Sequence, residues 1–181
     1  EFGGMIFKPV LDSWHEPKQA ILSAAQEAAA RNLRIIIGTT HDETWAFSKD
    51  RTHEGLERLR VVQQQRFDGP ATDFALQASR LGCSVWKYRF DWKATKSVYG
   101  ACHCIDLPFL FGRWDAWHAP MLRGLDHATF EQIGKLVRKP FIDFVHGYQF
   151  TQDQWPLFSI DNPLLKIIDA NGSVKIEHTS L

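Results

Sequence analysis

Gly100-Ala-Cys-His-Cys-Ile-Asp-Leu-Pro-Phe-Leu-Phe-Gly112 is apolar almost throughout, yet it contains a histidine and an aspartate three residues apart. Pro108 argues against an uninterrupted central strand or the middle of a helix at this place. We therefore expect His103 to lie on a loop that packs into the body of the protein. Hydrophobic neighbours can hold such a histidine in one position, as general acid and base catalysis requires. Taken alone, a histidine in this setting is more often structural than functional.

A second polar cluster follows a predicted buried strand earlier in the chain. Residues 33–38 include three consecutive isoleucines, as expected of a strand covered on both faces in a parallel sheet. His41, Asp42 and Glu43 come directly after it. Ligands and catalytic residues of open α/β sheets gather beyond the carboxyl ends of the strands. A solvated loop in which Asp42 caps the next helix fits the position equally well.

Helical patterns occupy the stretches between the predicted strands. Residues 18–32 follow Pro17, which suits a first helical turn, and are rich in helix formers. Residues 48–66 are weakly amphipathic, and Phe67-Asp-Gly-Pro70 is expected to break the helix there. Residues 70–81 form a clearer helix that Gly82 ends.

A long helix is predicted over residues 129–147. Ala128 or Thr129 is the expected cap, and Pro140 is expected to kink or divide the helix. Before it, residues 84–92 alternate apolar and polar side chains in the manner of a strand. After it, residues 164–169 and 174–178 predict a hairpin whose turn contains Asn171-Gly172.

Strands that alternate with helices predict an α/β fold with a few-stranded, mainly parallel sheet, flanking helices and a C-terminal β-hairpin. A sheet this small leaves a hydrophobic edge open. Another part of the same protein, or a second copy of the chain in a homo-oligomer, can pair with that edge.

Composition narrows the class of protein. The chain has 181 residues, the size of one domain, and 44% of them are hydrophobic. Basic and acidic residues number 21 each, so nothing predicts a nucleic-acid partner, and no apolar run reaches the roughly 20 residues that cross a membrane. Three cysteines, two of them too close for an ordinary disulfide framework, predict free thiols and favour a reducing compartment such as the cytoplasm. Residues 1–4 resemble a linker or a cloning remnant.

The two polar clusters together suggest a catalytic pair. Glu43 follows one predicted strand, and His103 follows the next one 60 residues later. A carboxylate bonded to one imidazole nitrogen fixes the tautomer, so that the other nitrogen can take a proton from a serine hydroxyl. The α/β-hydrolase order is nucleophile, acid, base. The acid and base are present in that order, but the sequence contains no Gly-x-Ser-x-Gly nucleophile elbow.

Several segments carry a family resemblance. Residues 100–112 resemble the catalytic-histidine segment of the type B carboxylesterases, the group of the cholinesterases and para-nitrobenzyl esterases, and residues 36–47 resemble the segment of their catalytic acid. Further segments of this chain are similar to stretches of the same family and follow in the same order: residues 7–12, 85–90 and 141–147, and Trp155-Pro156. The resemblance implies that residues 1–181 form the C-terminal portion of an α/β-hydrolase.

That resemblance assigns roles. It implies a carboxylic-ester hydrolase in which His103 is the base and Glu43 its orienting acid, with no metal and no cofactor. The partners would be a small-molecule ester and the N-terminal portion of the same hydrolase, which would carry the serine. The chain by itself is therefore expected to be inactive.

Departures from the family pattern keep other interpretations open. Cys104 and Thr44 stand where the family usually has glycine, so a side chain there can narrow the site or strain the loop. One alternative is a non-catalytic, cholinesterase-like adhesion protein. Another is a metal site at residues 102–104 helped by His41 or His53, although this spacing is wrong for the usual pair of cysteine ligands. For Asp42 and Asp106, hydrogen bonds that brace loops are the favoured role.

Overall fold

The computed structural model describes residues 17–116 and 118–179. The predictions for residues 1–4 and 7–12 lie outside these ranges. Four strands and the principal helices follow in the order α1 (Pro17–Ala30), β1 (Arg34–Thr40), α2 (His53–Gln63), α3 (Gly69–Arg80), β2 (Ser84–Phe90), α4 (Leu107–Phe111), α5 (His127–Val145), β3 (Leu164–Ile168) and β4 (Val174–His178).

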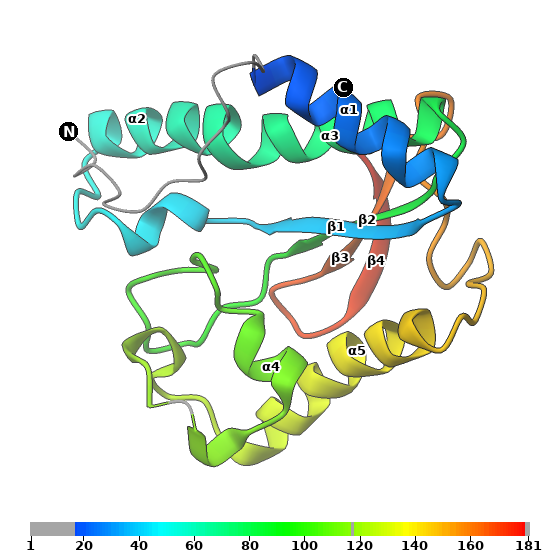
Figure 1. The fold of residues 1–181 in the computed structure, drawn as a ribbon. Coiled ribbons are helices and arrows are strands. Elements are labelled where there is room, and N and C mark those ends of the chain that lie inside the picture. The colour runs from blue at the N-terminus through cyan, green and yellow to red at the C-terminus, as the bar shows by residue number, and fades with distance from the viewer. Residues whose placement is uncertain (1–16, 117, 180–181) are drawn as a thin grey trace.

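The strands form one open mixed sheet in the order β1-β2-β3-β4. β1, β2 and β3 run parallel, and β3 and β4 form the antiparallel hairpin that the sequence predicted. Helices α1, α2 and α3 cover one face of the sheet, whereas α4 and α5 cover the other (Figure 1). The predicted α/β fold with a C-terminal hairpin is confirmed.

Strand β1 differs from the expectation in its burial. Ile35, Ile36 and Ile37 are only half-buried, although three consecutive isoleucines predicted a strand covered on both faces. The reason is the position of β1 at the edge of the four-stranded sheet, where no neighbouring strand within the described residues flanks its free side.

Small side chains join the first layer of helices to the sheet. Ala25 and Ala28 of α1 and Ala75 and Ala78 of α3 are buried in one cluster with Val85 of β2. Because alanine projects little beyond the backbone, α1 can approach α3 closely while α3 packs on the sheet.

Aromatic rings fill the opposite face of the sheet and hold the segment that carries His103. Phe109 of α4 is fully buried, and its ring centroid lies 5.6 Å from that of Phe90, 5.1 Å from that of Trp92 and 5.3 Å from that of Phe130. Pro108 sits in the first turn of α4, where its missing N–H leaves no bond unmade. The short helix therefore anchors the preceding loop to β2 and α5.

The predicted helix break at residues 67–70 was wrong. The backbone passes from α2 through one π-helical turn, Gln64–Asp68, directly into α3, so the two helices follow one another in line (Figure 1). A wider π turn relieves the clash that the Pro70 ring would cause with the carbonyl four residues earlier in an α-helix. The proline changes the helical pitch at this point and does not end the helix.

Two predictions for α5 also need correction. Asp126 is the N-cap, since its carboxylate accepts the Thr129 N–H at 2.8 Å, and neither Ala128 nor Thr129 fills that role. The helix also continues undivided through Pro140, so of the two outcomes expected there, a kink or a division, the division is wrong. Buried side chains on its inner face, among them Ile133 and Val137, hold the helix against the sheet on the N-terminal side of the proline.

Candidate active site

Glu43 begins a short 3-10 turn, Glu43–Ala46, three residues past the end of β1. Its side chain is buried, with the residue only 5% exposed. The Thr40 N–H donates to one carboxylate oxygen, Oε1, at 2.7 Å. A backbone bond of this kind fixes the rotation of the carboxylate, so that the second oxygen, Oε2, points in a set direction.

His103 lies on a turn, as the sequence predicted. The turn runs from Cys102 to Ile105, whose N–H donates to the Cys102 carbonyl at 3.1 Å. Both end residues are buried, so the turn is held at its base. Cys104, its third residue, has φ +67°, in the left-handed region that a glycine occupies at little cost. The strain expected from a side chain at this position is therefore present in the backbone.

The structure brings the two predicted site residues together. His103 Nδ1 lies 2.5 Å from Glu43 Oε2. The imidazole is partly accessible, with 43% of the side chain exposed, whereas 7% of the Glu43 side chain is exposed. With Nδ1–H donating to the carboxylate, Nε2 is the nitrogen that remains to accept a proton.

The bond to Glu43 sets the electrostatics of His103. It raises the pKa of the imidazole above the usual 6.5, against an opposing effect of burial, and the negative charges of Glu43 and Asp106 add to the rise. The arrangement therefore stabilises an imidazolium once a proton has been taken up.

Two phenylalanine rings flank the imidazole. The ring centroids of Phe47 and Phe67 each lie 5.5 Å from that of His103. Phe47 follows the Glu43 turn, and Phe67 belongs to the π turn between α2 and α3. The sequence did not identify Phe67 as a site residue, because its position depends on the π turn that replaces the predicted break.

Asp106 ties the loop that carries His103 to strand β2. The Tyr88 hydroxyl donates to Asp106 Oδ2 at 2.9 Å. Burial raises the pKa of the Asp106 carboxyl, and the bond from Tyr88 acts in the opposite direction. The pKa of the Tyr88 phenol is raised as well, chiefly because the side chain is buried and faces the Asp106 carboxyl.

Thr44, the other residue at a family glycine position, is also buried, and its hydroxyl donates to the Leu59 carbonyl at 3.3 Å. This bond ties the Glu43 turn to α2. The additional side chain is therefore accommodated without a positive φ angle, unlike that of Cys104.

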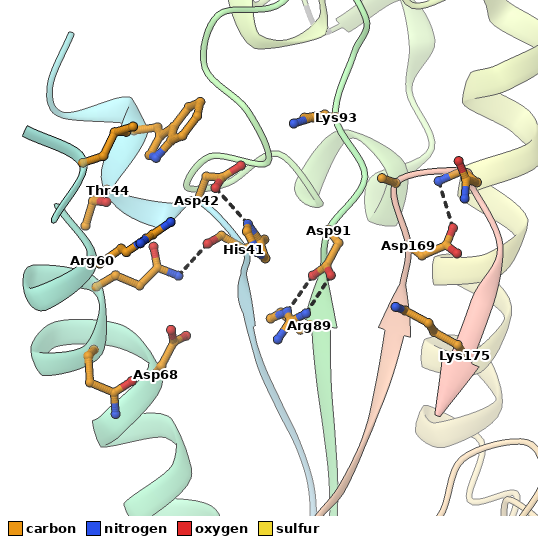
Figure 2. A pocket seen from close by; sticks show the side chains of 16 residues that line it. His41, Asp42, Thr44, Arg60, Asp68, Arg89, Asp91, Lys93, Asp169 and Lys175 are labelled. Atoms are coloured by element: carbon orange, nitrogen blue, oxygen red, sulfur yellow. Dashed lines mark hydrogen bonds and ion pairs between the residues drawn. The ribbon is translucent and has the colours of Figure 1, made fainter. Parts of the chain in front are cut away.

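A hollow of about 670 Å³ opens on the α2 and α3 side of the strand ends, and Figure 2 shows the side chains that line it. Two pairs of its charged residues bond to each other: Arg89 donates to Asp91 at 2.6 and 2.7 Å, and His41 bonds to Asp42 at 2.8 Å. Neither Glu43 nor His103 lines it. The hollow is thus separate from the bonded pair of Glu43 and His103.

Residues 102–104 do not gather ligands as a metal site would. Within the described ranges, no three His, Cys, Asp or Glu side chains converge in a way that could hold an ion. The three cysteines are free thiols, with Cys83 and Cys102 buried and Cys104 partly exposed. In residues 17–116 and 118–179, none of the helices has the length and apolar character needed to span a bilayer.

The fold and the geometry define a class of protein. An acid and a histidine that bond to each other beyond the carboxyl ends of two adjacent parallel strands, in that chain order, are typical of the α/β-hydrolase fold. Solved structures share that fold. A para-nitrobenzyl esterase superposes with a TM-score of 0.71 at 26% identity, covering 86% of this chain and 38% of its own. A thermophilic para-nitrobenzyl esterase gives a TM-score of 0.77 at 24% identity, covering 96% and 42%.

Curated relatives are similar in sequence to most of the chain. A probable N-octanoylanthranilate hydrolase of Rhodococcus erythropolis is 33% identical over 85% of this chain. A phenmedipham hydrolase of Pseudarthrobacter oxydans is 28% identical over 93%, and a para-nitrobenzyl esterase of Bacillus subtilis is 27% identical over 94%. No family profile matches the chain.

These relatives and structures confirm the resemblance to the type B carboxylesterases that the motifs predicted. The chain spans between 35% and 41% of the length of the three curated relatives. Its similarity is therefore to part of a carboxylic-ester hydrolase.

Proposed function

We propose that the chain supplies the base, His103, and the acid, Glu43, of a Ser-Glu-His triad in a carboxylic-ester hydrolase. The observation that carries this proposal is the 2.5 Å bond between Nδ1 and Oε2 of two residues 60 positions apart. The hydrolase and esterase relatives support the same reaction class.

The geometry supports a defined sequence of proton transfers. Nε2 of His103 would take the proton from a serine hydroxyl as that oxygen attacks the ester carbonyl, and Glu43 would stabilise the imidazolium that forms. The imidazolium would then give the proton to the departing alkoxide, which leaves an acyl-serine. In the second half, Nε2 would take a proton from a water molecule as that water attacks the acyl carbonyl. The imidazolium would then return the proton to the departing serine oxygen, which releases the carboxylic acid and restores the hydroxyl.

Because the sequence holds no Gly-x-Ser-x-Gly elbow, the serine and its oxyanion-stabilising groups would come from another part of the same hydrolase. Without the serine nucleophile, the acid and the base cannot form an acyl-enzyme. We therefore expect the 181-residue chain to be inactive, with a small-molecule ester as the substrate of the longer protein.

Hydrolysis of para-nitrophenyl esters tests the proposal. The chain and its His103→Ala variant should release para-nitrophenol at the same background rate. Activity of the chain that disappears in His103→Ala would contradict the predicted inactivity.

The longer protein tests the assigned roles. When the chain is joined to a segment that carries the elbow, kcat should fall by about 10⁶-fold in His103→Ala and by about 10⁴-fold in Glu43→Gln, since serine hydrolases lose about that much when the histidine or the acid of the triad is disabled. Full activity of either variant would overturn the assignment of that residue.

A further inference from the structure

Asp42 connects the two loops that carry the acid and the base. Its N–H donates to the Ala101 carbonyl at 2.9 Å, and its Oδ2 accepts the Ala101 N–H at 2.9 Å. These two bonds join Asp42, which directly precedes Glu43, to Ala101, which lies two residues before His103. They form a closed, reciprocal pair between segments 59 residues apart.

Both oxygens of the Asp42 carboxylate are engaged. Oδ1 lies 2.8 Å from Nδ1 of His41, the contact drawn in Figure 2, and Oδ2 accepts from Ala101. The residue is 8% exposed. Although burial opposes ionisation, the bonds from His41 and Ala101 lower the pKa of Asp42, so that the carboxylate is charged near neutral pH.

Gly100 leaves the space that this arrangement needs. Its φ angle is +64°, and a Cβ atom at this position would lie 2.4 Å from Asp42 Oδ2. A side chain at residue 100 would therefore displace the carboxylate from the Ala101 N–H. The backbone before His103 approaches Asp42 closely because residue 100 is glycine.

We infer that Asp42 is a positioning residue, whose backbone and carboxylate clamp Ala101 and thereby hold His103 at bonding distance from Glu43. The inference rests on the proposed function only in taking His103 as the base. A loop-bracing role was expected for Asp42 from the sequence. The new point is that this brace maintains the bond between His103 and Glu43. Glu43 supplies the negative charge to which His103 bonds, and Asp42 holds the loop of His103 close enough for that bond to form.

Nuclear magnetic resonance of the chain tests this inference without any need for activity. The downfield proton on His103 Nδ1 and the pH titration of its ring report the bond to Glu43. In Asp42→Ala, which removes the carboxylate, the downfield signal should be lost and the titration midpoint should move down from its raised value. In Asp42→Asn, an amide oxygen can still accept the Ala101 N–H, so the signal should persist.

Asp126→Ala is the matched control. It also removes a carboxylate that accepts a backbone N–H, that of Thr129 at 2.8 Å, but on the cap of α5. It should leave the His103 signal unchanged. An unchanged signal in Asp42→Ala, an equal loss in Asp126→Ala, or a loss in Asp42→Asn would each overturn the inference. If Asp42→Ala does not fold, Gly100→Ala takes its place, because its Cβ would displace the Asp42 carboxylate from the Ala101 N–H. The downfield signal should be lost in Gly100→Ala, and an unchanged signal would overturn the inference.

Glu43→Gln separates this inference from the proposed function. If Glu43→Gln leaves the His103 titration unaltered, the acid and base pair itself is wrong. If Glu43→Gln moves the titration and Asp42→Ala does not, only the clamp is wrong.

Discussion

Replacing Gly100 by alanine should destabilise the chain through two separate effects. The left-handed backbone, φ +64°, costs a residue with a Cβ about 1–2 kcal/mol. The new Cβ would also lie 2.4 Å from Asp42 Oδ2 and 2.9 Å from Trp45 Cε3. Moving the carboxylate away leaves the Ala101 N–H unpaired, which costs about 1–3 kcal/mol. Reduced freedom of the unfolded chain returns about 0.4–1 kcal/mol.

The expected net loss in the free energy of unfolding is about 1–5 kcal/mol, a large part of the roughly 5–15 kcal/mol of a typical domain. Gly82→Ala is the matched control, because Gly82 also has a positive φ, +94°, but nothing lies within 4 Å of its added Cβ. That variant should lose only about 1 kcal/mol.

Urea denaturation followed by tryptophan fluorescence measures both variants under the same conditions. Gly100→Ala should have the lower midpoint of the two. If the two variants unfold within about 0.5 kcal/mol of each other, the close approach of Asp42 to the His103 loop contributes nothing measurable, and the reasoning fails.

Two further predictions concern His103 and its neighbour. Cys104→Gly should unfold at the same urea concentration as the wild type or a higher one, with a gain of up to about 1 kcal/mol in the free energy of unfolding. The reason is that relief of the left-handed strain exceeds the cost of the added freedom of glycine in the unfolded chain. A complete loss of ester hydrolysis by this variant in the longer protein would instead give the thiol a role. Because Glu43 raises the pKa of His103, kcat/KM of the longer protein should fall as the pH drops through that raised pKa, where the base becomes protonated. A rate that does not change with pH from 6.5 upwards to 8 would contradict this assignment.

The elements that the sequence predicted well depend on local patterns. The hairpin of β3 and β4 follows from alternation around Asn171-Gly172, and α3 ends where Gly82 predicts. The pairing of Glu43 with His103 could also be predicted, since the ends of adjacent parallel strands meet at one edge of the sheet.

What the sequence did not predict depends on tertiary contacts. Pro70 was expected to end a helix, but a π turn keeps the chain helical and brings Phe67 beside His103. The bond between Asp42 and Ala101 joins residues far apart in the chain, and no local pattern signals it. The half-burial of β1 reflects its edge position, which the isoleucine run alone does not reveal.

The free energy of unfolding of the chain should depend on pH through the raised pKa of His103. A histidine whose pKa is raised by a carboxylate stabilises the folded state at pH values below about 6.5, and that contribution is lost as the pH rises through the raised pKa. The ion pair of His103 and Glu43 is partly exposed, so its contribution is screened by water and salt.

The pH titration of the His103 ring, compared between the wild type and Glu43→Gln, tests the central claim most directly. We expect His103 to titrate above 6.5 in the wild type, its midpoint to fall in Glu43→Gln, and the downfield Nδ1 proton to disappear in that variant. The same midpoint in both proteins would show that Glu43 does not hold the imidazole, and the proposed acid and base pair would be wrong.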